Sequence, residues 1–549
     1  MAVTTTPYIE RRLRRPRVNG FLLSTLIAAL CVALPMAVVV GFVFVGGSEA
    51  WAHLADTLLA RYAWNSLMLS FLVALGVIAI GVPAAWMIAF YRFPGRDLFS
   101  WLLLLPLAYP AYILAYAYTG VLDYSGPVLS WMRAIDAPAW LMSPFLNLKS
   151  LPGAALMLSL VLYPYVYLMA RAAFLDQSAN LMEAAYTLGQ SRWSVFRRVV
   201  IPMARPAIVA GTLLALMETL ADFGTVQYFG VQTFTTGIVR TYYGFGDTVG
   251  AAQLSSVLLG FVFVLIVVER LSRHRVQYYS DRLRQLNQAS VQLRGRKAFW
   301  MQCLCAIPVC FGFVLPTTLL LYWSVFFAEL ESLWGVMANS FLLAGGSAIL
   351  IVTLALMVAY ANRLHPSRWL TYLTLLVGLG YALPGVVIAM GVLIPFSVMD
   401  QWISAQLAPF GVPPSLYFSG TVFALVFAYV VRFLAVANGT IFSGLSRIRP
   451  SLDHSGRLLG LTQTGVLRSI HVPLMRGSVL TAALVCFVDI LKELPATLML
   501  RPFNFDTLAV KTYALASEER LIDAAAPALL IVVVGLLPVI WLNRSVSKE

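Results

Sequence analysis

"EAAYTLGQSRWSVFRRVVIP", Glu183 to Pro202, is a polar and basic stretch in a chain of 549 residues that is 60% hydrophobic and 11% charged. Glu183 to Leu188 favours a helix, with an acidic residue in the first turn, where the helix dipole stabilises it. Gly189 gives the backbone freedom for a turn, and an amphipathic segment follows up to Pro202. We expect a short helix, a turn and a second short helix at a membrane surface, and we call this segment the first loop.

The rest of the chain is too apolar for an ordinary soluble surface, of which about a quarter is charged. Its mean hydropathy is +0.82. Twelve apolar runs are long enough for a spanning helix of about 20 residues. They lie near 20–46, 66–90, 98–120, 151–171, 205–229, 251–268, 300–325, 340–360, 370–396, 416–436, 475–495 and 525–543. The sequence therefore predicts an all-α, polytopic membrane protein with about twelve transmembrane helices.

The net charge of +14 reflects topology in this interpretation. Cytoplasmic loops of membrane proteins collect Lys and Arg, and placing the N-terminus inside puts the basic segments on one side. These segments are 10–17, 91–96, 192–198, 270–297, 362–368 and 446–450. We expect a multi-pass protein of the bacterial inner membrane with both termini in the cytoplasm and no nucleic-acid partner.

The first loop has a second copy, "HSGRLLGLTQTGVLRSIHVP", His454 to Pro473, which we call the second loop. The glycine and the proline are thirteen residues apart in both loops, and both copies are offset by 271 residues: Gly189 and Gly460, Pro202 and Pro473. The same offset relates "VRTY" (239–242) to "VKTY" (510–513) and Phe234 to Phe505, so the register is expected to run on without a gap. Upstream the offset is 274, which pairs Asn65 with Asn339 and Pro110 with Pro384.

This self-similarity predicts a tandem duplication. Because each half holds six spans, both copies enter the membrane in the same direction and form a parallel repeat. The predicted units are a first repeat (1–269) with its loop at 183–202, a basic cytoplasmic linker (270–298), and a second repeat (299–549) with a degenerate loop at 454–473.

"EAA", three further residues, Gly189 and then "VIP" resemble the EAA-loop signature of the membrane subunits of binding-protein-dependent ABC importers. In that family the loop forms a coupling helix that docks into a groove of the cytoplasmic ATPase. The residues carried over are Glu183, Ala184, Ala185, Gly189 and Pro202 in the first loop, and His454, Gly460 and Pro473 in the second. Since His454-Ser455-Gly456 replaces Glu-Ala-Ala, the resemblance implies that the second loop grips its ATPase differently or more weakly.

Two longer stretches resemble the fused, two-half permeases of ferric iron importers over essentially the whole chain. They are "METLADFGTVQYFGVQTFTTGIVRTYY" (217–243) and "LKELPATLMLRPFNFDTLAVKTY" (491–513). The resemblance implies a permease that moves ferric iron; fused thiamine permeases share the architecture, so another solute stays an alternative. A twelve-span transporter driven by an ion gradient also fits the span count and the parallel halves.

An importer needs an energy source, and no lysine in this chain follows a glycine as a P-loop requires. We therefore expect ATP on a partner ATPase, present in two copies, no cofactor bound by this chain and no enzymatic activity of its own. The resemblance implies a periplasmic binding protein that delivers solute to the outer loops. Those loops lie near 121–150, 229–250, 397–415 and 496–524.

Ionisable residues inside spans are costly and are functional candidates by default. Glu218 and Asp222 are four residues apart, as are Asp489 and Glu493, so each pair is expected to share one face of a helix. Four carboxylates around a central path would suit a hard trivalent cation, which prefers oxygen ligands. The alternatives are gate or bundle-stabilising hydrogen bonds, caps at helix breaks near Gly224 or Pro495, or water-exposed helix ends. We expect no metal site beyond transient contact with these carboxylates.

Overall fold

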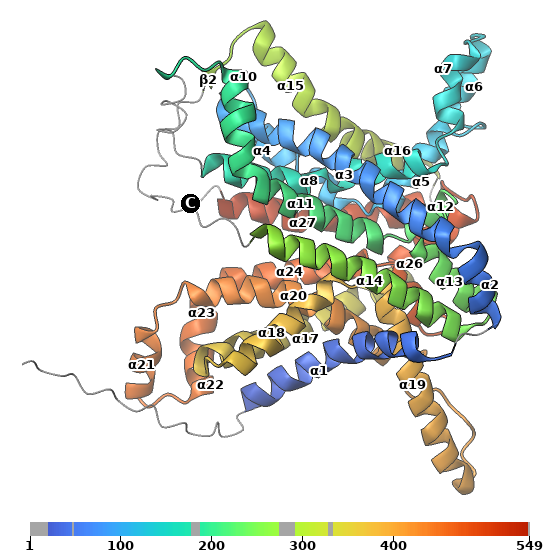
Figure 1. Cartoon of the computed structure of the whole chain (residues 1–549), viewed down its shortest axis with the longest axis vertical. Helices are drawn as coiled ribbons and strands as arrows, with labels where there is room; N and C mark the ends of the chain where they lie inside the picture. Colours follow the sequence, from blue (N-terminus) through green and yellow to red (C-terminus); the bar gives the residue numbers. More distant parts are fainter. Residues whose placement is uncertain (1–19, 47–48, 177–186, 274–290, 328–332, 547–549) are drawn as a thin grey trace, which may run out of the picture.

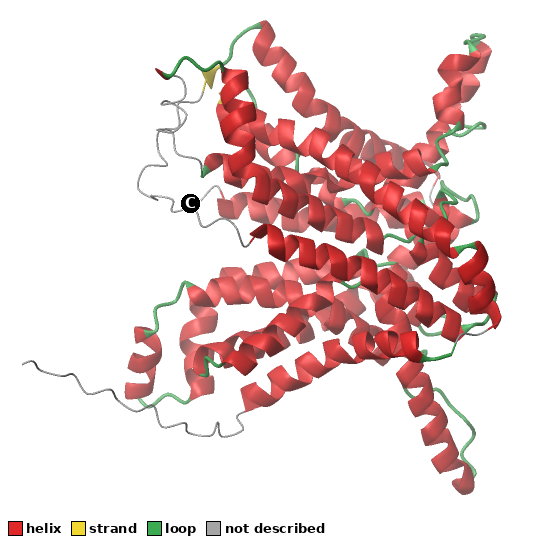
Figure 2. Ribbon diagram, in the orientation of Figure 1, coloured by secondary structure: helices red, strands yellow, loops and turns green. Residues whose placement is uncertain are grey.

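The computed structural model describes residues 20–46, 49–176, 187–273, 291–327 and 333–546. Within these ranges the fold is almost entirely helical (Figure 2). In the described part, β structure is limited to a two-stranded parallel pairing of β1 (Tyr91–Arg92) with β2 (Val291–Gln292). The predicted all-α class is confirmed, since the apolar runs bury their backbone groups in helices as a membrane demands.

The first half supplies six predicted spans and several short helices. Its long elements are α1 (Gly20–Gly41), α3 (Leu59–Phe90), α4 (Arg96–Leu102) followed by α5 (Ala111–Leu122), α8 (Leu151–Leu175), α11 (Ile201–Ala221) and α14 (Thr248–Arg273). The short elements are η1 (Phe42–Phe44), α2 (Glu49–Thr57), η2 (Leu105–Ala108), α6 (Pro127–Ala134), α7 (Ala139–Leu146), α10 (Arg192–Val195), η3 (Phe196–Val200), α12 (Gly224–Tyr228) and α13 (Phe234–Gly244).

The second half repeats this plan. Its long elements are α15 (Arg296–Val309) with η5 (Cys310–Val314) and α16 (Leu315–Phe327), α17 (Trp334–Leu364), α18 (Arg368–Leu379), α19 (Gly385–Leu407), α20 (Val422–Ser446), α24 (Arg476–Leu491) and α27 (Ala525–Val546). The short elements are η7 (Gly380–Ala382), η8 (Ala408–Phe410), α21 (Ser451–Leu458), α22 (Gln463–Val466), η9 (Leu467–His471), α23 (Val472–Leu474), α25 (Pro495–Leu500) and α26 (Leu508–Ser517).

Each of the twelve predicted runs contains an apolar helix. In the described ranges, nine helices are long and apolar enough to cross a membrane, and two bent helix pairs raise the number to eleven. The twelfth run corresponds to a shorter apolar helix, Ala525–Ile540.

Two of the apolar runs are broken at a proline. The run 98–120 bends by 89° between η2 and α5, and the run 370–396 is divided between α18 and α19. The breaks fall at Pro110 and Pro384, where the preceding Tyr109 and Leu383 have extended backbones, with ψ of 130° and 128°. The reason is steric, because a proline ring disfavours the helical conformation of the residue before it.

The two halves repeat their internal contacts. The Asn65 side chain donates to the Gln232 carbonyl, and Asn339 donates to the Asp506 carbonyl. The next residue in each span, Ser66 or Ser340, accepts from the first backbone N–H of α13 or α26. The internal repeat is therefore present in three dimensions, while the exact boundaries 1–269, 270–298 and 299–549 stay a prediction.

The predicted gapless register is wrong beyond the helix breaks. The short helices α12 and α25 begin at Gly224 and Pro495, an offset of 271, but α13 and α26 are capped by Thr233 and Thr507, an offset of 274. Three extra residues therefore lie between the start of α25 and the start of α26. A shift of three residues is nearly one helical turn. The apolar positions of the two halves therefore still matched in the sequence at an offset of 271.

The first helix of each half packs against the other half. Helix α1 contacts α17, α18 and α19 of the second half, and α15 with α16 contacts α3, α4 and α5 of the first half in addition to α27 of its own half. Figure 1 shows α1 beneath the lower bundle, beside α17 and α18. The helix backbones approach closely, since a Cβ added to Gly391 in α19 would lie 2.6 Å from the Pro35 carbonyl oxygen in α1. This exchange ties the two halves together.

Candidate functional site

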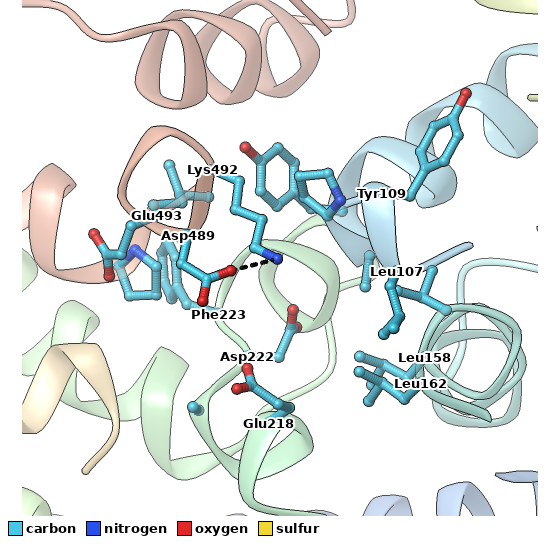
Figure 3. A pocket seen from close by; sticks show the side chains of 18 of the residues that line it. Leu107, Tyr109, Leu158, Leu162, Glu218, Asp222, Phe223, Asp489, Lys492 and Glu493 are labelled. Atoms are coloured by element: carbon cyan, nitrogen blue, oxygen red, sulfur yellow. Dashed lines mark ion pairs between the residues drawn. The ribbon is translucent and has the colours of Figure 1, made fainter. Parts of the chain in front are cut away.

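All four predicted carboxylates, Glu218, Asp222, Asp489 and Glu493, line one cavity of about 130 Å³ between the halves. The breaks at Pro110, after α11 and after α24 bring non-helical backbone to its wall. In a membrane protein, irregular backbone at this depth is tolerated where it is buried or lines a cavity. Figure 3 shows Glu218, Asp222 and Asp489 around the space in front of Lys492. Their role in transport stays a prediction.

Asp222 does not lie on α11, so its predicted place on one helix face with Glu218 is wrong. The helix ends at Ala221, and Asp222 has an extended backbone. Its carboxylate accepts from the backbone N–H groups of Thr225 and Val226, both at 3.1 Å, and from the Thr225 hydroxyl at 3.0 Å. These are the unpaired donors at the start of a helix. Asp222 therefore caps α12, as one of the sequence alternatives proposed.

Glu493 has the same position in the second half, beyond the end of α24 at Leu491. Its carboxylate accepts from the N–H groups of Ala496 and Thr497, each at 2.9 Å, and from the Thr497 hydroxyl at 2.5 Å. The buried Arg432 of α20 adds an ion pair at 3.3 Å. Glu493 is thus fixed by the start of α25 and by a cation, and in Figure 3 its carboxylate points away from Lys492.

Glu218 and Asp489 lie on α11 and α24, and each is bonded to the polar group at the end of another side chain. The Tyr381 hydroxyl donates to Glu218 at 2.7 Å, and the Lys492 ammonium pairs with Asp489 at 2.9 Å. The two residues are equivalent in the repeat, since 489 − 218 = 271. The four carboxylates that line the cavity therefore divide into a pair that caps broken helices and a pair that is bonded through the ends of other side chains.

The sequence interpretation missed several polar residues that line the cavity. Arg432 lies inside an apolar run and could have been found by the rule that marked the carboxylates. Tyr165 and Tyr381 carry no comparable signal, because tyrosine is common in membrane helices and at their ends. In the part of the chain that the structure describes, no three His, Cys, Asp or Glu side chains are grouped so that they could hold a metal ion.

The two loops lie at the same end of the molecule, with α10 in the upper bundle and α21 to α23 in the lower one (Figure 1). Glu183, Ala184 and Ala185 fall outside the described residues. Gly189 and Gly460 both have positive φ, 76° and 84°, as expected for a turn that favours glycine.

The segments after the two turns are also equivalent. Each loop continues into one turn of π-helix, Phe196–Val200 or Leu467–His471, and Pro202 and Pro473 follow in the first turn of the next helix. Apolar side chains beside the turn glycines face solvent, with Leu188 80% exposed and Leu459 83% exposed.

The loops differ in how they join the membrane helices. The first loop runs into α11 as one helix over 193–221, whereas the second bends by 82° between Leu474 and Arg476. In the first loop, Phe196 packs against Trp86 of α3, with ring centroids 4.6 Å apart.

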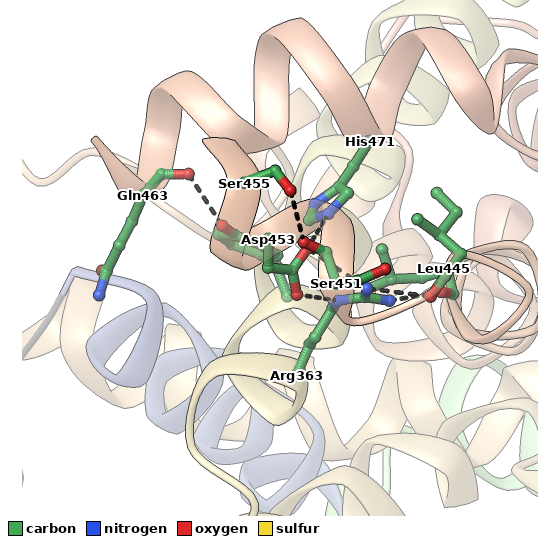
Figure 4. Close-up of polar contacts among 9 residues, drawn as sticks. Arg363, Leu445, Ser451, Asp453, Ser455, Gln463 and His471 are labelled. Carbon is green, nitrogen blue, oxygen red and sulfur yellow. Dashed lines mark hydrogen bonds and ion pairs between the residues drawn. The ribbon is translucent and has the colours of Figure 1, made fainter. Parts of the chain in front are cut away.

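An ion-pair network holds the second loop (Figure 4). Arg363, at the end of α17, donates to Asp453 of α21 at 2.7 Å and to the Leu445 carbonyl at 2.7 Å. The buried His471 lies 2.5 Å from the same carboxylate. At the repeat offsets of 274 and 271, the positions of Arg363 and His471 hold Ala89 and Val200 in the first half. We call this network the Asp453 latch; His454, the residue that replaces Glu183, is exposed beside it.

Partial burial alone would raise the pKa of Asp453, but the hydrogen bonds from Arg363 and His471 outweigh it and hold the pKa below its ordinary value. A carboxylate with a lowered pKa stabilises the fold above its unfolded pKa, near 4, and loses this contribution only as pH falls through the lower folded value. The Asp453 latch is therefore closed at neutral pH.

Asp453→Asn should open the latch, because it removes charge-assisted hydrogen bonds of about 1.5–3 kcal/mol. We expect tryptic cleavage after the exposed Arg457 of α21 to become roughly tenfold faster in membranes at neutral pH. His454→Asn, one residue away and exposed, is the matched control and should cleave at the original rate. Equal cleavage of Asp453→Asn and the unmodified protein would show that the latch does not hold α21.

Comparison with known proteins gives matches along most of the chain. Residues 78–277 match the family model described as binding-protein-dependent transport system inner membrane component. The Fe(3+)-transport system permease protein FbpB 2 of Haemophilus influenzae is 26% identical over 97% of this chain and 100% of its own length. The ferric transport system permease protein FbpB of Actinobacillus pleuropneumoniae is 23% identical over 84% of this chain and 67% of its own. The sulfate transport system permease protein CysT of Escherichia coli is 27% identical over 37% of this chain and 72% of its own.

Proposed function

We propose, from the premise that this chain is a fused permease of a binding-protein-dependent ABC importer, that it carries ferric iron across the bacterial inner membrane. One observation carries the choice of cargo: Glu218 and Asp489, equivalent residues of the two halves, face one cavity between them. Carboxylate oxygens suit a hard cation. The similarity to Fe(3+)-transport permeases along nearly the whole chain supports the same choice.

Two partners follow from the family: an ATPase and a periplasmic binding protein. In our proposal two ATPase subunits in the cytoplasm dock on the first and second loops and hydrolyse the ATP, while this chain binds no cofactor. The start of α1 and the end of α27 lie at the same end of the molecule as the loops (Figure 1). This arrangement supports cytoplasmic termini. The opposite end, with α6, α7 and the far end of α19, would receive the binding protein.

The helices that follow the loops also carry the cavity carboxylates. Helix α11 begins at the first loop and bears Glu218 near its other end, and α24 follows the second loop and bears Asp489. Closure of the ATPase pair would therefore move the loop and the carboxylate of each half together. Rocking of one half against the other would open the cavity to each side in turn.

Reconstitution tests this function. The permease, its ATPase and its binding protein are placed in proteoliposomes, and uptake of radioactive iron from the loaded binding protein is measured. We expect uptake to require ATP and to survive a proton ionophore. Uptake that persists without the ATPase and collapses with the ionophore would instead establish a gradient-driven transporter. Accumulation of thiamine or sulfate, with no accumulation of iron, would overturn the choice of cargo.

A further inference from the structure

Two of the four cavity carboxylates are bonded to backbone N–H groups, and the other two are bonded to side chains. Asp222 and Glu493 accept backbone N–H groups at the starts of α12 and α25, so binding a cargo there would leave these helix ends without their caps. Glu218 and Asp489 are held by a tyrosine hydroxyl and a lysine ammonium. Both groups stand at the ends of rotatable side chains and can move away.

The partners of this second pair are not equivalent. Lys492 lies three residues after Asp489, and at the offset of 271 the first half has Ala221 three residues after Glu218. Both cations that line the cavity, Arg432 and Lys492, belong to the second half. Arg432 is committed to Glu493, whereas Lys492 pairs with a residue that faces the cavity. Its side chain is 29% exposed, so it has space to move.

The cavity also contains buried polar groups that have no hydrogen-bond partner among the described residues. This indicates that the cavity binds water or a ligand. Tyr112 is 4% exposed and lines the cavity, and its hydroxyl has no hydrogen-bond partner in the described residues. The Nε of the buried Arg432 has none either. Buried polar groups are almost always paired. These donors can bond the oxygen atoms of water or of an oxyanion that accompanies a trivalent cation.

We propose that Lys492 is a tethered counter-cation, which occupies Asp489 in the empty cavity and which the cargo cation must displace. The inference rests on the proposed function. An unpaired carboxylate at membrane depth is costly, and Lys492 removes that cost in the absence of cargo. After displacement the ammonium stays close and repels the bound cation. Transport needs binding strong enough for entry and weak enough for release, and Lys492 supplies the second condition.

The test is a binding titration on the full-length permease in nanodiscs. The probe is Tb³⁺, a hard trivalent ion whose luminescence is excited by nearby tyrosines, here Tyr112, Tyr165 and Tyr381. We expect Lys492→Met to bind Tb³⁺ about tenfold more tightly than the unmodified protein, because a nearby like charge is removed. Lys492→Arg keeps the charge and should stay within about twofold of the unmodified affinity. Lys297→Met, which removes an exposed lysine at the start of α15, is the matched control and should not change it.

A second change tests the link to Asp489. Lys492→Met combined with Asp489→Asn should lose the tenfold gain, since the released carboxylate is then absent. Unchanged or weaker Tb³⁺ binding in a monodisperse Lys492→Met protein would overturn the inference and leave the proposed function intact. Absence of Tb³⁺ binding in every variant would also overturn the inference. The proposed function would then be tested by iron uptake in proteoliposomes.

Discussion

Replacement of Glu218 by Gln together with Asp489 by Asn should lower iron uptake by about 100-fold or more. Each substitution removes a charged oxygen ligand and keeps the shape of the side chain, and a contact with a charged group contributes about 1.5–3 kcal/mol. Two such losses correspond to at least about 100-fold. Radioactive iron uptake into proteoliposomes with the ATPase and binding protein measures the effect. Lys492 loses its partner but its side chain is 29% exposed, so thermal stability should change less than it does when the buried Arg432 loses its partner.

The matched control is Asp222→Asn with Glu493→Gln, the same chemistry four residues further along each half. Here we expect a lower melting temperature, because a lost helix cap costs about 1 kcal/mol and a buried cation without its partner costs about 3–5 kcal/mol. The cation left behind is Arg432. Unchanged uptake by a well-expressed Glu218→Gln, Asp489→Asn protein would remove these two residues from the pathway.

The sequence was sufficient to identify the four carboxylates as candidates but not to predict which of them cap helices. Hydropathy was sufficient for the twelve apolar runs, and the cost of charge in a membrane was sufficient to single out Glu218, Asp222, Asp489 and Glu493. A spacing of four residues predicts a shared helix face only while the helix continues. The breaks after Ala221 and Leu491 separate the roles, and apolar periodicity carries no clear signal for breaks of this kind.

Tertiary packing accounts for what could not be predicted. Tyr381 reaches Glu218 across the boundary between the halves, 163 residues along the chain, and no local pattern encodes such a contact. The sequence also gives no signal that α1 and α15 pack against the other half, because a helix packed against its own half has the same apolar composition. The three-residue shift before α26 stayed hidden because it nearly equals one helical turn.

Gly189→Pro should abolish both iron uptake and its coupling to ATP hydrolysis. Gly189 has a φ of 76°, and proline fixes φ near −65°, so the turn of the first loop cannot form. Gly189→Ala is the matched control at the same position. Among the described residues, an added Cβ meets nothing within 4 Å, so only the strain of positive φ remains, about 1–2 kcal/mol. We expect Gly189→Ala to keep most uptake, measured together with copurification of the ATPase.

Gly460→Pro makes the same change in the second loop and should reduce uptake less than Gly189→Pro does. The backbone is equivalent, with a φ of 84°, but the Asp453 latch holds α21 to α17 independently of the turn. The first loop has apolar Ala89 and Val200 at the corresponding latch positions. Adding Asp453→Asn to Gly460→Pro should therefore lower uptake to the level of Gly189→Pro.

If Gly189→Pro retains uptake and ATPase copurification at normal protein levels, the first loop does not couple to the ATPase. If Gly460→Pro alone is as severe as Gly189→Pro, the latch does not distinguish the loops.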